Sequence, residues 1–331
     1  SARLGLDDPF YFFFRQLIFV TLGLAGAFFI SILSPNDARR IGVLALLGSL
    51  IILISLPFIG YEVKGAIRWL RVGSISLQPS EFIKPAFIVF VAWIFSAVKN
   101  DNSVLASFIV TLIWLFTILL LLNQPDVGQA FLLTVCFAAV CFFGGISIRG
   151  TLTFIFIIMG LVSLAYIKLH HFRVRIEKFL SPSNSDTYQI DKALEAISNG
   201  GFWGRGPGEG AVKYSLPDGH TDYIFAITVE EFGYLISTFL IILLGSFVLR
   251  CFRNAVKLND YFSQLAVAGL ATMIGVQLLI NLFVNLNMIP SKGMTLPFIS
   301  YGGSSMLALC FTSGLILSFT RKRPGAYGYG E

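Results

Sequence analysis

Long apolar stretches separated by polar connectors dominate this chain. The hydrocarbon core of a bilayer is about 30 Å thick, and a helix needs about 20 apolar residues to cross it. Nine stretches meet or approach that length, and each is expected to form a membrane helix: 12–33, 41–59, 82–98, 104–122, 127–143, 151–169, 223–249, 263–288 and 303–320. The pattern predicts an all-α polytopic integral membrane protein, with a single transmembrane domain over residues 1–331.

One connector is far longer than the others. Residues 170–222 hold most of the hydrophilic sequence of the chain. Within them, YQIDKALEAIS (188–198) has the pattern of an amphipathic helix, and GGFWGRGPGEG (200–210) is rich in glycine. We therefore expect one large loop on a single face of the membrane, with a helix inside it.

Basic residues indicate which face is which. Nine spans place the ends of the chain on opposite sides, so the connectors form two sets. One set carries Arg39, Arg40, Lys99, Arg149, Arg250, Arg253, Lys257, Arg321, Lys322 and Arg323. The other carries Lys64, Arg68, Arg71, Lys84 and Lys292, together with the long loop. The positive-inside rule discounts long loops and predicts that the first face is cytoplasmic. The cations that remain in short loops of the second face indicate an anionic ligand there.

Composition excludes the soluble classes of protein. Of the 331 residues, 56% are hydrophobic and 13% are charged, whereas about a quarter of a soluble domain is charged. The net charge is +6, but the basic residues form no dense runs, so a nucleic-acid-binding protein is set aside. The four cysteines lie in or at the edge of apolar runs, and we expect buried free thiols rather than a zinc site.

The segment KGAIRWLRVGSISLQPSEFIKP (64–85) concentrates charge at the start of a predicted membrane helix. Glu81 and Lys84 are three residues apart and therefore share one helix face. One interpretation is a structural ion pair among basic side chains that reach toward the interface. The other is that Arg68 and Lys84 bind phosphate oxygens, while Glu81 orients Lys84 or accepts a hydrogen bond.

The segment LPDGHTDYIFAITVEEFG (216–233) closes the long loop and runs into an apolar helix. Asp222 lies at the mouth of this helix, with His220 beside it. Capping is the simpler role for Asp222 or Thr221, because the N–H groups of a helix N-terminus need acceptors. Glu230 and Glu231 follow two turns further in, at membrane depth, where ionisable groups are usually functional. Desolvation raises the pKa of such a carboxylate toward that of a general base, and we favour a functional role.

Two further segments carry polar groups. NQPDVGQ (123–129) has the Pro–Gly break and the aspartate, Asp126, of a tight turn, and a structural role is favoured for it. In the stretch 263–288, Gln277, Asn281 and Asn285 recur every four residues and form a polar stripe that must face other helices or a cavity.

The polar stripe is followed by MIPSKGMTLPFISYGGSS (288–305). Its prolines and glycines exclude a continuous helix. Irregular backbone at membrane depth occurs where it lines a cavity inside the protein. Lys292 is the only charged residue in this segment. We expect Lys292, Ser304 and the preceding Asn285 to contribute to substrate binding.

Four of these segments together resemble the FtsW/RodA (SEDS) family of peptidoglycan glycosyltransferases. The motifs that carry the resemblance are GAIRWL…QPSEFIK, QPDVGQ, LPDGHTDYIFA…EEFG and PSKGMTLPFISYGGSS, in the order of the family and across essentially the whole chain. PSKGMTLP and GRGPGEG are similar to the FtsW, or cell-division, branch. The family has ten spans, so Ser1 to Asp8 is expected to be the exit of a first helix that this chain lacks. SPSNSDTYQ lacks the glycine of the family turn, and no role is expected for Asp186.

The resemblance implies a reaction and its participants. Lipid II would be added to a glycan anchored on undecaprenyl diphosphate, with inversion, at the periplasmic side of the bacterial inner membrane and at the division septum. Asp222 would deprotonate the acceptor hydroxyl. Arg68, Lys84 and Lys292 would stabilise the diphosphate, alone or with Mg²⁺ or Mn²⁺, and Glu81 and His220 would contact substrate. No organic cofactor is expected. The implied partners are a class B penicillin-binding protein and other division proteins.

Two other functions fit the same residues. A lipid II flippase would need polar residues that continue across the whole membrane, whereas these cluster at the outer mouth. A non-catalytic scaffold for a division transpeptidase predicts that Asp222 substitutions preserve activity but lose binding.

Overall fold

A computed structural model describes residues 10–63, 65–73, 75–97, 104–145, 148–168, 173–174, 176–177, 188–290 and 293–322. Most of these residues are helical, and every one of the nine predicted apolar stretches contains a long helix. These helices are α1 (Tyr11–Ile32), α2 (Pro35–Ile59), α3 (Pro79–Ala97), α4 (Val104–Asn123), α5 (Val127–Phe143), α6 (Ile148–Lys168), α9 (Ile224–Val256), α10 (Tyr261–Asn285) and α11 (Gly303–Thr320). The predicted all-α polytopic architecture is confirmed.

The lengths of the helices agree with a membrane location. Within the described residues, six helices are long and apolar enough to cross a bilayer, namely α1, α2, α3, α9, α10 and α11. Shorter apolar helices lie at Ser107–Asn123 and Val127–Phe143. The exposed surface of α1, α2 and α9 is rich in large apolar side chains, as lipid contact requires. The number of helices that cross the membrane stays a prediction.

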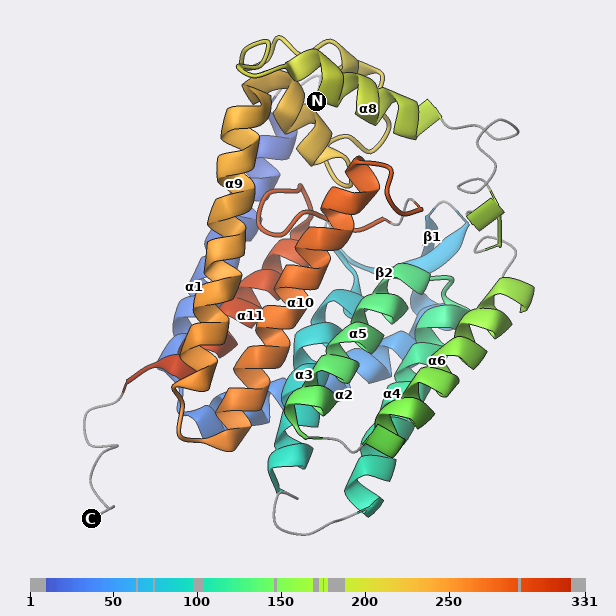
Figure 1. Cartoon of the computed structure of the whole chain (residues 1–331), viewed down its shortest axis with the longest axis vertical. Helices are drawn as coiled ribbons and strands as arrows, with labels where there is room; N and C mark the ends of the chain where they lie inside the picture. Colours follow the sequence, from blue (N-terminus) through green and yellow to red (C-terminus); the bar gives the residue numbers. More distant parts are fainter. Residues whose placement is uncertain are drawn as a thin grey trace.

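Helix α10 forms the centre of the bundle (Figure 1). It packs against α3, α5, α9 and α11, and most of its residues are buried. Helix α1 packs along α11, where a Cβ at Gly23 would lie 2.7 Å from Cys310 Sγ. Small residues at such contacts let helix backbones approach closely when no hydrophobic effect drives them together. The four cysteines are buried and free, as predicted.

A small antiparallel sheet connects α2 to α3. Its strands are β1 (Tyr61–Val63), β2 (Ala66–Val72) and β3 (Ile75–Leu77), in the order β1-β2-β3. Tyr61 is opposite Trp69, and Leu70 is opposite Leu77. The periodicity of the sequence did not predict this sheet, because its strands are short and carry charges in the middle of an irregular connector.

The long connector contains the predicted amphipathic helix as α8 (Tyr188–Gly200). It lies across the end of α9 (Figure 1). A short 3-10 helix, η3 (Val212–Tyr214), follows before α9 begins. Helix α9 is broken at Gly233, where φ is 76° and ψ is 176°. A short segment, Ile224–Phe232, therefore precedes the long segment Tyr234–Val256, and the break lies beside the connector.

Candidate active site

A cavity of about 700 Å³ opens at the end of the bundle that carries the sheet. Helices α3, α5, α9 and α11 begin beside it, and α10 ends there. Of the residues predicted to act on substrate, four line the cavity: Arg68, Glu81, Asp222 and Ser304. Asp126, Asp218, Thr295 and Tyr301 line it as well. Described residues of all four family-like segments therefore line one cavity.

Asp222 is held in place by the polar stripe of α10. The side-chain amides of Asn281 and Asn285 donate to the backbone carbonyl of Asp222, at 2.9 and 3.0 Å. Both asparagines are fully buried. Asn281 also donates to Met294 O at 2.7 Å, which ties the irregular segment before α11 to the same helix. The stripe, which was predicted to face other helices or a cavity, therefore holds two neighbouring stretches of backbone beside the cavity.

Asn285 has a further effect on the start of α9. Its Oδ1 accepts from Ala226 N at 3.1 Å while its Nδ2 donates to Asp222 O. In a continuous helix the Ala226 N–H would bond directly to the carbonyl of Asp222, four residues earlier. The asparagine side chain bridges these two groups instead, so Asp222 lies outside the helix. The N-cap of α9 is Tyr223, whose side chain makes no capping hydrogen bond, so Asp222 is not the N-cap residue.

Glu81 and Lys84 form a buried ion pair on α3. Lys84 Nζ lies 2.8 Å from Glu81 Oε2 and 3.3 Å from Gln277 Oε1. Gln129 of α5 donates to the other carboxylate oxygen of Glu81. Glu81 lines the cavity, whereas Lys84 is not among the lining residues. The structure thus shows the ion pair between Glu81 and Lys84 that one interpretation of the sequence predicted, and Lys84 Nζ contacts protein groups inside the bundle.

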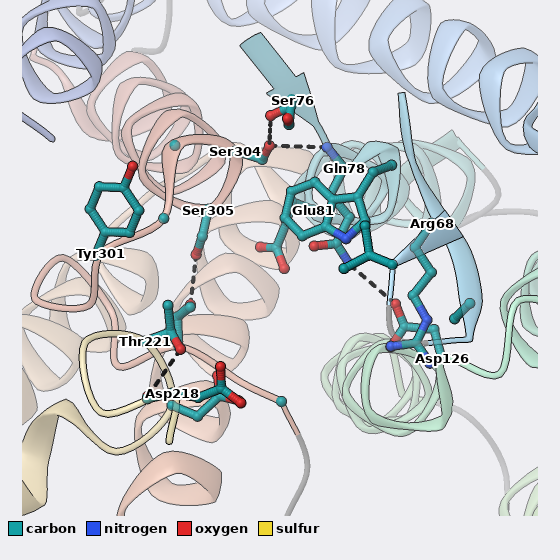
Figure 2. A pocket seen from close by; sticks show the side chains of 18 of the residues that line it. Arg68, Ser76, Gln78, Glu81, Asp126, Asp218, Thr221, Tyr301, Ser304 and Ser305 are labelled. Carbon is teal, nitrogen blue, oxygen red and sulfur yellow. Dashed lines mark hydrogen bonds and ion pairs between the residues drawn. The ribbon is translucent and has the colours of Figure 1, made fainter. Parts of the chain in front are cut away.

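Arg68 and Asp126 line the cavity on the side across from Asp218 and Thr221 (Figure 2). The Arg68 guanidinium, on β2, donates to the backbone carbonyls of Gln124 and Pro125, and it lies 3.9 Å from Asp126 Oδ1. Gln78 Nε2 donates to the other carboxylate oxygen of Asp126. Burial raises the pKa of Asp126 and Arg68 opposes that rise, while the nearby Glu81 charge adds to it. Asp126 is thus a cavity residue as well as a turn residue.

Ser304 joins α11 to the sheet and to α3. Its hydroxyl accepts from Gln78 N at 3.0 Å and donates to Ser76 O at 3.2 Å (Figure 2). No side chain caps the first turn of α11, whose N-cap is Gly302. The N-terminus of α11 therefore directs its positive dipole end toward the cavity.

Two other predicted residues do not line the cavity, and a third is not described. The His220 ring packs against Phe12 at 5.0 Å and Tyr301 at 5.8 Å between ring centroids, and His220 is not among the cavity-lining residues. Asn285 donates a hydrogen bond to the backbone carbonyl of Asp222 and does not line the cavity. Lys292 lies outside the described residues.

Arg15 was missed by the sequence analysis. It lies on α1 and lines the cavity, with its guanidinium 2.7 Å from the Tyr11 hydroxyl. The available signal was an arginine inside the apolar stretch 12–33, because ionisable residues in membrane helices are usually functional. It was overlooked because the connectors alone were compared for charge.

Glu230 and Glu231 were predicted to act at membrane depth, but their contacts hold the connector. Glu230 is fully buried, and its carboxylate accepts from the backbone N–H groups of Ala211 and Val212 at 2.9 Å each. Glu231 pairs with Lys213 at 2.7 Å. Neither glutamate lines the cavity. These contacts tie η3 to the short segment of α9.

A divalent cation was also predicted here. The cavity carboxylates are hard oxygen ligands of the kind that Mg²⁺ and Mn²⁺ prefer. Among the described residues, however, no three His, Cys, Asp or Glu side chains come close enough together to hold an ion. The residues present do not form a ready-made metal site, and the metal requirement stays a prediction.

Known proteins resemble this chain over nearly its whole length. The family model described as "cell cycle protein", for FtsW, RodA and SpoVE, matches residues 2–324. The probable peptidoglycan glycosyltransferase FtsW of Caulobacter vibrioides is 47% identical over 328 residues, which are 99% of this chain and 84% of that protein.

Solved structures show the same fold. A chain of a peptidoglycan synthase complex, described for its coordination of polymerization and crosslinking, matches with a TM-score of 0.77 and 28% identity over 96% of this chain and 91% of that chain. RodA of Thermus thermophilus matches with a TM-score of 0.71 and 27% identity over 96% and 90% of the two chains. The family match across the chain and the shared fold lead to one conclusion: the chain belongs to the FtsW/RodA/SpoVE family.

Proposed function

We propose that this protein is a peptidoglycan glycosyltransferase of cell division that polymerises lipid II, with Asp222 as the general base. The observation that carries the proposal is the placement of Asp222. It lines the cavity, and two buried asparagines hold its backbone carbonyl. A carboxylate that lines the cavity on a fixed stretch of backbone is suited to proton abstraction from a sugar hydroxyl. The naming of the Caulobacter relative as a probable FtsW glycosyltransferase supports the reaction and the division branch.

In this reaction Asp222 takes the proton of the 4-hydroxyl of the lipid II GlcNAc. The oxygen attacks the anomeric carbon of the terminal MurNAc of the growing glycan, and undecaprenyl diphosphate leaves. One displacement inverts the anomeric centre. Negative charge develops on the diphosphate, so the site needs positive groups across the cavity from the attacking hydroxyl.

Two described arginines and a helix end supply that positive charge. Arg15 on α1 and Arg68 on β2 both line the cavity. The N-terminus of α11 lies beside it without a side-chain cap, and helix N-termini bind phosphate through their N–H groups and dipole. We assign the diphosphate to these groups, with Lys292 as a further basic residue nearby in the sequence and a divalent cation as an optional participant. Glu81, oriented by Lys84, and Ser304 would contact the sugars.

Location and partners follow from the same site. The cavity lies at the end of the bundle opposite the predicted cytoplasmic connectors, and this position supports our proposal that the site faces the periplasm. Lipid II and the undecaprenyl-linked glycan reach this face with their diphosphates at the membrane boundary. One structural relative is part of a peptidoglycan synthase complex, which supports a class B penicillin-binding protein as the partner at the septum.

The experiment compares Asp222→Asn with Asp191→Asn, a matched change at an exposed acid of α8. The purified protein and its transpeptidase partner are given lipid II, and glycan chains are separated by length. Asp222→Asn should lower polymerisation by about 10²- to 10⁴-fold, the contribution typical of a general base, and Asp191→Asn should not. Wild-type rates for Asp222→Asn would refute the assignment. Loss of lipid II translocation in vesicles, with polymerisation intact, would favour the flippase.

A further inference from the structure

The turn between α8 and the rest of the connector exposes two large aromatic side chains. Phe202 is 58% exposed and Trp203 is 77% exposed. Their rings contact edge to face, with centroids 5.1 Å apart. Isolated apolar side chains are common on protein surfaces, whereas this phenylalanine and tryptophan are adjacent and form one apolar patch on a glycine-rich turn.

Backbone hydrogen bonds fix the height of this turn along α9. Tyr234 N donates to Gly201 O at 3.0 Å, and Leu235 N donates to Phe202 O at 3.4 Å. The aromatic pair therefore lies level with the first residues after the break at Gly233. These bonds join main chain to main chain, so the height does not depend on side-chain rotamers.

At this level, the surface of α9 changes from polar to apolar. On one side of the break, Glu231 pairs with Lys213. On the other side, the long segment exposes a run of apolar side chains: Leu235, Ile236, Phe239, Ile242 and Leu243. Such a run on a membrane helix faces lipid. The aromatic pair thus continues the lipid-facing surface at its outermost level.

We propose that Phe202 and Trp203 form an interfacial anchor that inserts into the membrane–water boundary beside α9. Phenylalanine and tryptophan place an apolar ring among acyl chains, and the indole N–H remains within reach of headgroups, which is why tryptophan is enriched at this depth. Arg205, exposed two residues later, is positioned for lipid phosphates. The occupant of the patch is the lipid surface itself, not a protein.

The anchor also acts on the broken helix. Two backbone N–H groups of the same turn donate hydrogen bonds to the short segment of α9. Arg205 N donates to Glu230 O at 2.9 Å, and Gly206 N donates to Glu231 O at 3.0 Å. A turn fixed in the interface therefore sets the depth at which the segment Ile224–Phe232 lies. This consequence depends on the geometry alone and not on the reaction proposed above.

Site-directed spin labelling tests the depth of the turn. The native cysteines are all buried, so a nitroxide attached at Trp203→Cys in the full chain reports on that position. The protein is placed in bilayers of phosphatidylethanolamine and phosphatidylglycerol. Relaxation is then compared between oxygen, which concentrates in lipid, and a water-soluble nickel chelate. Phe239→Cys is the lipid-facing reference, and Tyr214→Cys, at an exposed aromatic residue of the same connector, is the matched control.

The label at 203 should be relaxed several-fold more by oxygen than by the nickel chelate, as at 239, whereas the label at 214 should show the reverse. A label at Phe202→Cys should agree with 203, and it supplies the reading if the tryptophan variant does not fold. Equal nickel access at 203 and 214 would overturn the proposal. A second result would also overturn it: the nickel chelate reaches the label at 203 in bilayers of lipid alone, but not after the transpeptidase is added. That result would assign the patch to a protein partner.

Discussion

Replacing Asn285 with leucine tests whether the polar stripe of α10 positions Asp222. The two side chains are similar in size, so the change removes hydrogen bonds without leaving a large cavity. Leucine cannot donate to Asp222 O or accept from Ala226 N. The first turn of α9 is then free to close on itself or to move, and Asp222 moves with it.

The expected loss of stability follows from these contacts. Each lost bond contributes about 0.6–1 kcal/mol. If the Ala226 N–H stays buried without an acceptor, it adds about 1–3 kcal/mol. The free energy of unfolding should therefore fall by about 2–5 kcal/mol. A displacement of about 1 Å at a reacting group lowers the rate by up to about 100-fold, so kcat for polymerisation should fall by about 10- to 100-fold with little change in KM.

The assay measures lipid II polymerisation well below the melting temperature of the variant, together with thermal unfolding in detergent. Thr272→Val is the matched control, because Thr272 is a polar residue of α10 that bonds to Ala268 O within its own helix. This control should leave kcat unchanged. If Asn285→Leu loses stability but keeps the wild-type kcat, the asparagine is structural only, and the positioning argument is refuted.

Three further changes test other parts of the structure. Lys84→Met leaves the Glu81 carboxylate buried without its cation and should lower the free energy of unfolding by about 3–5 kcal/mol. In the double variant, Glu81→Gln should recover part of that loss, as measured by thermal unfolding. No recovery would contradict the ion pair between Glu81 and Lys84. Gly233→Ala places a Cβ 2.4 Å from backbone atoms at a positive φ and should cost about 3 kcal/mol or more. Gly245→Ala on the same helix meets nothing within 4 Å and should be neutral or slightly stabilising, and equal melting temperatures of the two variants would contradict the break. Burial raises the pKa of Asp126 above 3.8, so its charged form destabilises the fold and stability is lost as pH rises through the folded-state pKa. The melting temperature of Asp126→Asn, relative to that of the wild type, should therefore increase as pH rises above about 4. A difference between the two melting temperatures that does not change with pH would contradict this account.

The sequence by itself determined where the helices lie and which segments contribute polar residues to the cavity. Apolar runs are local, and a run of about 20 residues has few alternatives to a membrane helix because every backbone polar group must be satisfied within lipid. The irregular segment before α11 was predicted for the same reason, since its prolines and glycines cannot continue a helix. Motif likeness then identified the family.

Only the tertiary structure decided what each polar side chain contacts. Gln78 bonds to Ser304, and Asn285 bonds to Asp222, across more than 60 residues of sequence in each case. Such contacts depend on how helices pack, and no local pattern specifies that packing. Only the structure therefore shows that Lys84 pairs with Glu81 and that His220 packs against aromatic rings. Arg15 of α1 lines the cavity because packing against α11 determines which face of this mostly apolar helix points inward.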